Sequence, residues 1–338
     1  MKNLLEIILI TYNRAPDLQH TLEALFASDS PVRDISITVL DNHSTDNTSK
    51  ILQDVAKIHS NLHIIRHPKN IGSNANIVRA FELAQAPYVW VLCDDDDLHW
   101  QAWPEVTRAM QNTADAIVVN TEYIKSKNLT KGQLYRLVTF LPSAIYKTSL
   151  LDDTTLLNMY NNIATWFPHL AAMAKVLNTQ GKIVVTSSDI VTAGKNTNNS
   201  SICLGKKETL QNKTLPVINQ LLDDIGPRSK HQSIELGYLQ ACDLLQDASI
   251  RKQAVESCIA GISFPHMLRK IIRSNWKIHN GYLGQLVPAY CAFNTRQKLI
   301  GLSLFLFQLL SLPKYKMSYK KHCKKIARYK KHFKKEAN

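Results

Sequence analysis

An apolar run that ends in four carboxylates decides the fold of this chain: YVWVLCDDDD, residues 88–97. The first six residues are rich in aromatic and β-branched side chains and follow Pro87, which is typical of a fully buried strand. Four adjacent like charges repel one another and are costly to desolvate, so we expect them at an exposed strand end. A divalent cation there would neutralise them, and a solvated acidic turn is the alternative.

Three earlier segments also have the composition of strands: Leu4–Ile10, Ile35–Leu40 and Leu62–Arg66. Each is followed by a polar loop and then by apolar residues at helical spacing. Strands that alternate with helices form βαβ units. The sequence therefore predicts an α/β fold, in which a mostly parallel sheet with right-handed crossovers is flanked by helices.

Polar residues follow all four expected strands: Thr11, Asp41, Asn70 and Asp94. The carboxyl ends of parallel strands lie at one edge of a sheet, where open α/β folds bind ligands. We therefore expect these residues to line one rim, as a nucleotide and metal crevice. The sequence contains neither G-x-G-x-x-G nor G-x-x-x-x-G-K-[ST], so a hydride-transfer or P-loop function has no support.

The positive charge of the chain is concentrated near its end. The 338 residues are 45% hydrophobic and carry a net charge of +14, and this length suits roughly two domains. Eleven Lys or Arg residues and one acid follow Gly301, which gives this tail a charge of +10. Six cysteines without C-x-x-C spacing indicate reduced thiols in a cytoplasmic protein. We expect no signal peptide, and no apolar run reaches the ~18 residues of a spanning helix.

Four blocks, in this order and spacing, resemble family 2 glycosyltransferases of the GT-A fold: ILITYNR (8–14), VLDNHSTD (39–46), NIGSNAN (70–76) and LCDDDD (92–97). The resemblance weakens beyond residue 130 and ends near residue 200. It implies a Rossmann-related GT-A domain over residues 1–200, with a nucleotide-binding half (1–97) and an acceptor half (98–200). We expect a mainly helical C-terminal region (201–312) and a basic tail (313–338) after it.

The resemblance also implies roles for the rim. The implied nucleotide contacts are Thr11, Asn13, Asp41, Asn70, Asp94 and Asp95. Asp94 and Asp96 would form the family's D-x-D, in which Asp96 binds the Mn²⁺ or Mg²⁺ that bridges the two donor phosphates. Because the run holds four acids, this register is open by one residue, and Asp97 is kept as a catalytic candidate. The implied donor is a nucleoside-diphosphate sugar, with UDP favoured.

The base that would take the acceptor's proton is where the chain departs from the family. The family places an acid, often Glu-Asp, at a helix start in its second half, but the corresponding TWFPHLAAM (165–173) has no carboxylate. His169 is the candidate, because an imidazole titrates near neutrality. A structural hydrogen bond at a helix start is the alternative for His169. Asp152 and Asp153 are outside candidates and are also typical of a helix cap.

The predicted function is metal-dependent transfer of a sugar to a hydroxyl of a glycan or lipid-linked acceptor, with inversion, in the synthesis of surface polysaccharide, lipopolysaccharide or capsule. A catalytically degenerate GT-A domain that serves as a binding scaffold is the alternative. The basic tail, with its interleaved aromatic residues, predicts docking on an anionic membrane from the cytoplasmic side. Nucleic acid fits its charge nearly as well, and a solvated tail is the remaining alternative.

Overall fold

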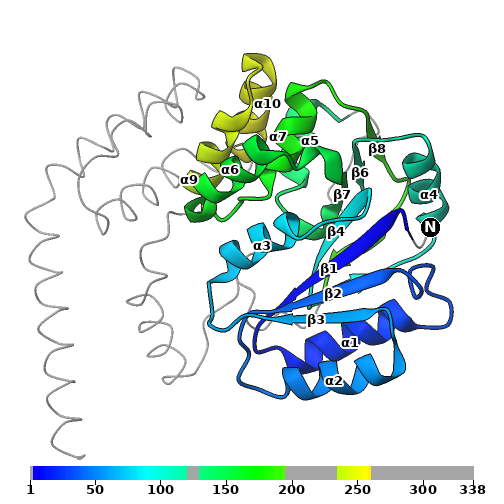
Figure 1. Ribbon diagram of the computed structural model, residues 1–338. Coiled ribbons are helices and arrows are strands. Elements are labelled where there is room, and N and C mark those ends of the chain that lie inside the picture. The colour runs from blue at the N-terminus through cyan, green and yellow to red at the C-terminus, as the bar shows by residue number, and fades with distance from the viewer. Residues whose placement is uncertain (1–2, 120–128, 195–233, 260–338) are drawn as a thin grey trace, which may run out of the picture. The chain divides into compact units, whose positions relative to one another are not determined.

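A seven-stranded sheet forms the centre of the computed structural model (Figure 1). The structure describes residues 3–119, 129–194 and 234–259. The chain divides into two units, Met1–Cys258 and Ile259–Asn338, and the described elements lie in the first apart from the last residue of one helix. The strands of the large sheet are, in chain order, β1 (Leu5–Thr11), β2 (Ser36–Asp41), β3 (Leu62–Arg66), β4 (Tyr88–Cys93), β6 (Ala116–Val118), β7 (Ala144–Lys147) and β8 (Ile183–Val185).

Helices and a small second sheet complete the described part. Two short strands, β5 (Asp96–Leu98) and β9 (Val191–Ala193), pair with each other. The α-helices are α1 (Ala15–Phe26), α2 (Thr48–Ile58), α3 (Ser73–Glu82), α4 (Trp103–Gln111), α5 (Lys131–Leu137), α6 (Asp153–Asn161), α7 (Leu170–Asn178), α9 (Ile234–Ala241) and α10 (Ala248–Ile259). The short 3₁₀ turns are η1 (Leu141–Ser143), η2 (Thr148–Leu150), η3 (Ile163–Thr165) and η5 (Cys242–Leu244).

The order of the large sheet is β3-β2-β1-β4-β7-β6-β8, and its first four strands are parallel. Chain order runs outward from β1 to β3 and then returns to β4, so the topological switch point lies between β1 and β4. Right-handed crossovers place α1 and α2 on one face of the sheet and α3 on the other, as Figure 1 shows. The predicted α/β fold with a mostly parallel sheet is therefore confirmed.

Strand register brings the predicted rim together. Thr11, the last residue of β1, is paired with Asp41, the last residue of β2. On the other side of β1, Ile10 is paired with Cys93, the last residue of β4. The two polar positions and the start of the acid run therefore lie at the same edge of the sheet.

The direction of the sheet reverses at β7, which runs antiparallel to both β4 and β6. Tyr88 at the start of β4 is paired with Lys147 at the end of β7. The amino end of β7, preceded by η1, therefore lies at the edge that carries the rim, and its carboxyl end lies at the opposite edge. This reversal decides which loops of the second half can reach the crevice.

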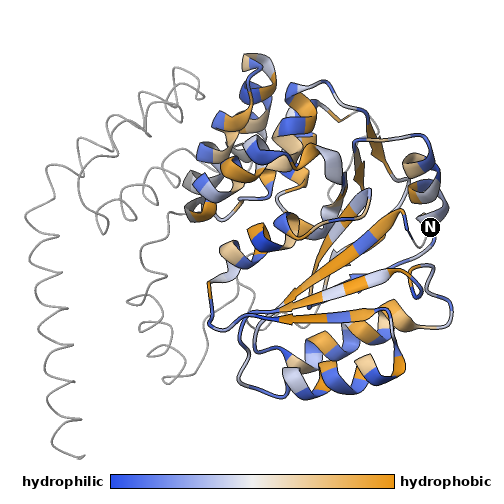
Figure 2. Ribbon diagram, viewed as in Figure 1, coloured by the Kyte–Doolittle hydropathy of each residue, from blue (hydrophilic) through white to orange (hydrophobic). Residues whose placement is uncertain are grey.

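The central strands are buried on both faces, which is why they are almost wholly apolar (Figure 2). Trp90 of β4 is fully buried and lies 5.9 Å from Trp103, ring centre to ring centre. The indole nitrogen of Trp90 donates a hydrogen bond of 2.8 Å to the Pro142 carbonyl oxygen in η1. A large apolar ring with its polar atom satisfied anchors β4, and with it the start of the acid run.

Helices α9 and α10 pack on the sheet domain through close backbone approaches. A Cβ atom on Gly237 of α9 would lie 1.9 Å from the Thr165 carbonyl oxygen, so this contact requires glycine. The Tyr135 hydroxyl of α5 donates to the Ala241 carbonyl oxygen at 2.6 Å. Of the predicted C-terminal helical region, residues 234–259 are described and are largely helical. The rest of that region and the basic tail lie outside the described residues.

None of the described helices combines the length and apolar character needed to cross a membrane.

Candidate functional site

The acid loop, Asp94–Asp97, follows β4 and turns directly into β5. Asp94 and Asp96 are only 3% and 4% exposed, so the loop is not the solvated turn that was the alternative. β5 pairs with β9, and a Cβ atom on Gly194 would lie 1.9 Å from the Asp95 carbonyl oxygen. The acid loop is therefore fixed at its start by β4 and along its backbone by the residue that follows β9.

Asp94 is tied to the end of β1 and the start of α1. The Thr11 hydroxyl donates to its carboxylate at 2.6 Å, and a guanidinium nitrogen of Arg14 lies 3.0 Å from its other oxygen. The Thr21 hydroxyl donates to its carbonyl oxygen at 3.0 Å. Burial raises the pKa of Asp94 to about 6, although Arg14 and Thr11 act in the opposite direction. Asp94 thus holds the loop to β1 and α1.

Asp95 shares Arg14 with Asp94. The same guanidinium nitrogen lies 2.6 Å from the Asp95 carboxylate, and burial raises the pKa of Asp95 despite this partner. Arg14 stands in the block ILITYNR, but sequence analysis gave it no role. A positive charge close in sequence to the end of β1, in a rim that ends in four acids, is the signal that could have identified it.

Asp96 has a buried carboxylate oxygen, Oδ2, that finds no hydrogen-bond partner in the described part of the chain. Burial raises the pKa of Asp96 well above its usual range, and the neighbouring Asp95 and Asp94 raise it further. Carboxylate oxygens of Asp95 and Asp96 lie within 4.8 Å of each other and of the Cys93 sulfur. A buried, unpartnered anion beside two others is relieved by a bound cation.

The donor set fits a hard divalent ion. Asp95 and Asp96 offer the oxygen ligands that Mg²⁺ and Mn²⁺ prefer. Burial raises the pKa of the Cys93 thiol well above its usual range, and a soft sulfur is a poor ligand for a hard ion, so the carboxylate oxygens are the better ligands. Asp97 differs from the other acids: its side chain is 35% exposed, and its carboxylate lies 3.6 Å from an imidazole nitrogen of His20.

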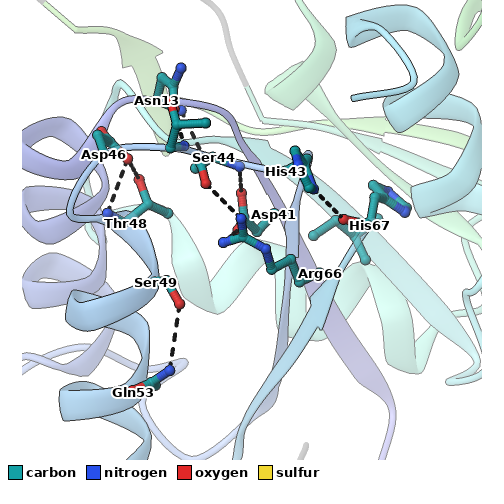
Figure 3. Close-up of polar contacts among 12 residues, drawn as sticks. Asn13, Asp41, His43, Ser44, Asp46, Thr48, Ser49, Gln53, Arg66 and His67 are labelled. Atoms are coloured by element: carbon teal, nitrogen blue, oxygen red, sulfur yellow. Dashed lines mark hydrogen bonds and ion pairs between the residues drawn. The ribbon is translucent and has the colours of Figure 1, made fainter. Parts of the chain in front are cut away.

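Asp41 lies in a separate cluster at the end of β2 (Figure 3). It is 1% exposed, and both of its oxygens are occupied. The Ser44 backbone N–H donates to one at 2.8 Å, and the Arg66 guanidinium lies 3.1 Å from the other. Arg66 also donates to the Ser44 carbonyl oxygen at 2.8 Å. Asp41 thereby fixes the loop after β2, with partners that sequence analysis did not predict.

Asn13 connects the loop after β1 to the loop after β2. Its backbone N–H donates to the Ser44 hydroxyl at 2.9 Å, and its side-chain oxygen accepts from the Thr45 N–H at 2.7 Å. Asn13 and His43 have φ angles of 52° and 68°. Such left-handed backbone at non-glycine residues is uncommon and is found at functional sites, where the surroundings hold it in place.

Asn70 is positioned by Asn42, another residue to which no role was given. The Asn42 side-chain amide donates to the Asn70 side-chain oxygen at 3.0 Å, and that oxygen also accepts from the Gly72 N–H at 2.8 Å. The Asn42 side-chain oxygen accepts from the Ile71 N–H at 2.9 Å. Asn42, 2% exposed, thus holds the loop after β3 against the end of β2. Its place directly after Asp41 was the available signal.

His169 has a structural setting and not that of an accessible base. It is 3% exposed, and its Nε2 lies 3.1 Å from the Val138 carbonyl oxygen, so Nε2 carries the proton. Burial lowers the pKa of His169 to about 4, which leaves the imidazole neutral. The geometry supports the structural alternative, because a buried ring bound to a carbonyl cannot reach an acceptor hydroxyl.

Asp152 is the cap of α6. Its carboxylate accepts from the Thr155 N–H at 2.9 Å and lies 2.7 Å from the Lys175 ammonium. The hydrogen bond from Lys175 and those from Thr155 lower the pKa of Asp152 to about 2. The loop that holds Asp152 follows β7 and lies at the edge opposite the crevice, so the cap interpretation is confirmed.

The structure thus gathers the predicted residues into two neighbouring groups joined by the pairing of β1 with β2: Thr11, Asp94, Asp95 and Asp96 around Arg14, and Asn13, Asp41 and Asn70 around Ser44 and Asn42. It does not bring His169 into either group.

Comparison with known proteins identifies the family. The model of glycosyl transferase family 2 matches residues 6–178, just over half of the chain, and the chain belongs to this family. Among curated proteins, the abequosyltransferase RfbV of Salmonella typhimurium is 25% identical over 211 residues, which are 53% of this chain and 62% of that protein. An uncharacterized glycosyltransferase of Mycoplasma pneumoniae, the MG025 homolog, is 30% identical over 96 residues, 28% of this chain and 32% of that protein.

The chain therefore spans less than two thirds of either curated relative. Among solved structures, S. aureus TarS 1–349 in complex with UDP-GlcNAc has a TM-score of 0.51 and 14% sequence identity, with 82% of each chain covered. A likeness at this identity shows the fold. The expected family and GT-A fold are both confirmed.

Proposed function

We propose that this protein transfers a sugar from a nucleoside-diphosphate donor to a hydroxyl acceptor, with Mn²⁺ or Mg²⁺ held at the acid loop. One observation carries the proposal: the buried Asp96 carboxylate keeps an unpartnered oxygen beside Asp95 and Asp94, at the switch point of a family 2 sheet. A buried anion without a partner is unfavourable in a purely structural role. Family membership supports the class of reaction.

The two groups of rim residues divide the work of binding the donor. Asp41, Ser44 and Asn70 line the position of the base, in loops that hydrogen bonds already fix. Thr11 and Asp94 lie toward the sugar-phosphate side of the same rim. Fixed polar groups bind without reordering, so the donor is oriented at small entropic cost.

Asp95 and Asp96 would hold the metal, which supplies a clamp on the diphosphate and stabilises the charge that develops on the leaving group. Asp97 has the more accessible carboxylate and is proposed to act on the acceptor side of the reaction. Residues 165–173 contain no acid and His169 is buried, so the acceptor's proton must leave through another group.

The test is a panel of UDP-, GDP-, CDP- and dTDP-sugars, incubated with Mn²⁺, Mg²⁺ or a chelator while release of the nucleoside diphosphate is measured. We expect turnover with one donor and a divalent ion, and none with chelator. The anomeric configuration of the product, read by NMR, tests the proposed inversion. Absence of turnover and of nucleotide binding across the whole panel would refute the proposal.

A matched pair of variants ties turnover to the acid loop. Asp96→Asn should abolish transfer, whereas Asp54→Asn should not. Asp54 is an acid of α2 whose side chain is 55% exposed and lies 2.8 Å from Lys57. Both substitutions replace one carboxylate by an amide, so they separate loss of the metal ligand from loss of charge.

A second candidate is a binding protein that keeps the fold without reacting. The buried His169 and the missing acid in residues 165–173 favour it. Calorimetry distinguishes the two functions, because a non-catalytic protein can bind nucleotide with a favourable heat while showing no metal-dependent release of product.

The acceptor is proposed to be a glycan or a lipid-linked glycan of the cell surface. The name of one relative, an abequosyltransferase, supports transfer of a sugar and specifies no acceptor. The basic tail, which lies outside the described residues, is proposed to dock a cytoplasmic protein on anionic lipid. Deletion of the residues after Pro313 should abolish binding to vesicles that contain phosphatidylserine. If the deletion abolishes RNA binding and leaves vesicle binding unchanged, nucleic acid is the partner of the tail.

A further inference from the structure

Arg14 is the cation that already occupies the acid loop. It precedes α1, and one guanidinium nitrogen lies 3.0 Å from the Asp94 carboxylate and 2.6 Å from the Asp95 carboxylate. Two carboxylates that follow each other in the chain are therefore drawn toward one positive group. Its side chain is 31% exposed, so it is partly buried but has solvent on one side.

Neutralisation of the loop is incomplete. Arg14 contacts Asp94 and Asp95, whereas the buried Oδ2 oxygen of Asp96 has no hydrogen-bond partner among the described residues. The remaining acid, Asp97, lies 3.6 Å from His20, which carries a charge only when protonated. Among the described residues, Arg14 thus contacts two of the four acids, and the loop retains affinity for further positive charge.

A divalent ion and the Arg14 guanidinium compete for the carboxylate of Asp95. The Asp95 and Asp96 oxygens lie within 4.8 Å of each other, so an ion that takes both lies close to the guanidinium. Two positive groups at that separation repel each other. A planar guanidinium on a long side chain with access to solvent can turn away, and a diphosphate offers the oxygens that it binds in charge-assisted pairs.

We propose that Arg14 is an internal counter-cation of the acid loop, which competes with the divalent ion for Asp95 and passes to the donor diphosphate when the ion binds. The inference rests on the proposed function, since it requires a metal and a diphosphate at this rim. Arg14 then has two opposite effects on binding affinity. Arg14 weakens binding of the metal alone, and it strengthens binding of the metal–diphosphate pair.

The experiment measures both roles in the full chain at a fixed pH of 8. Mn²⁺ binding is measured by electron paramagnetic resonance without nucleotide, and UDP binding by calorimetry with saturating Mn²⁺. The variants are Arg14→Gln, Arg14→Lys and the control Arg33→Gln. Arg33 lies in the connection before β2, at the amino end of the strands and away from the rim.

We expect Arg14→Gln to bind Mn²⁺ about tenfold more tightly and UDP about tenfold more weakly than the unsubstituted protein. Arg14→Lys keeps the charge but not the planar fork, so both changes should be smaller. Arg33→Gln should change neither. Circular dichroism and thermal unfolding confirm that each variant is folded.

The outcomes separate this inference from the proposed function. If the unsubstituted protein binds Mn²⁺, but Arg14→Gln binds it no more tightly or binds UDP no more weakly, the inference is overturned and the metal site stands. If the unsubstituted protein binds no Mn²⁺ at millimolar concentration, with or without UDP, the metal-dependent function falls and the inference with it.

Discussion

Asp41, the last residue of β2, and Asp96, the first residue of β5, are both buried acids, yet their surroundings are opposite. Both oxygens of Asp41 are occupied, one by the Ser44 N–H and one by Arg66. Asp96 keeps a buried oxygen without a partner in the described part of the chain. One rim therefore serves two purposes. A satisfied carboxylate fixes the shape of a pocket, whereas an unsatisfied one reserves its affinity for a cation.

Substitution of Asp96 is the most direct test of this contrast between the two acids. We expect Asp96→Asn to lower the rate of transfer at least about a thousandfold, because the group that holds the metal is lost. Without metal at pH 8 the same variant should be more stable by about 1 kcal/mol, because burial raises the pKa of Asp96 on folding, and a raised carboxyl pKa costs stability at a pH above its unfolded value. Steady-state kinetics and denaturant unfolding measure the two effects. Retention of a tenth of the activity would argue against a metal at this residue.

Substitution of Asp41 should lower the stability of the folded chain, whereas substitution of Asp96 should raise it. Asp41→Ala leaves the Ser44 N–H and the Arg66 guanidinium without their partner, and we expect a loss of about 2 kcal/mol, a value reduced because Arg66 is 39% exposed. Asp41→Asn retains an acceptor for Ser44 and should lose less. Urea unfolding at pH 8 checks both variants. A more stable Asp41→Ala protein would remove the contrast with Asp96.

Gly194 tests whether the acid loop depends on its lateral support. In Gly194→Ala the new Cβ would meet the Asp95 carbonyl oxygen at 1.9 Å, so β9 and the loop must move apart. We expect a loss of about 2 kcal/mol and weaker Mn²⁺ binding. The matched control is Gly181→Ala, whose Cβ would meet its nearest neighbour at 3.0 Å. Equal losses in the two variants would show that the approach to Asp95 is not decisive.

The pH dependence should distinguish folding from metal binding. The pKa of Asp94 is raised from 3.8 to about 6 on folding, so its proton stabilises the folded chain fully below pH 3.8, and this contribution is lost as the pH rises through 6. Mn²⁺ needs the ionised carboxylates of Asp95 and Asp96, whose pKa values are raised by burial, so its affinity should rise with pH across the range in which these two acids ionise. Parallel trends in metal-free stability and Mn²⁺ affinity between pH 4 and 7 would contradict this assignment.

Asp152 is an exposed acid that serves as a reference for the two buried ones, and its variants should show the smallest change in stability. Its cap contact with Thr155 is lost in Asp152→Ala, for which we expect a cost of about 1 kcal/mol. Asp152→Asn keeps a capping oxygen and loses only the ion pair with Lys175, so it should cost about half as much. Transfer activity should be unchanged in both, because α6 begins at the edge opposite the rim. Loss of activity in Asp152→Asn would reopen a role for this acid in the reaction.

Local signals were sufficient to predict the first four strands, β1 to β4, and the polar residues that follow them. The run that ends at Asp94, and the apolar segments that end near Thr11 and Asp41, each combine a buried strand with a polar terminator. Such patterns depend on a few adjacent residues. Their meeting at one edge then follows from the parallel arrangement of the strands, and register confirms it.

Contacts between distant segments were not predictable in the same way. Arg14 reaches Asp94 across 80 positions and Arg66 reaches Asp41 across 25, and such pairs depend on exact loop geometry. The sequence left His169 open between a base and a structural residue for a different reason. Helix α7 is apolar almost all round and seven of its residues are buried, so it carries the preceding His169 into the interior. The run of alanine and leucine after His169 was the available sign of that burial.

Because the sheet reverses direction at β7, inserted residues should be poorly tolerated before this strand and well tolerated after it. The residues before β7 lie beside the end of β4, where Pro142 accepts the hydrogen bond from Trp90, so added length there would disturb the wall of the crevice. The residues after β7 emerge at the far edge, where Ser149 is exposed. New sequence can enter there during evolution with little effect on the chemistry, since the backbone contact of that loop with the sheet, from the Thr148 N–H to the Pro87 carbonyl oxygen, lies at the edge opposite the rim.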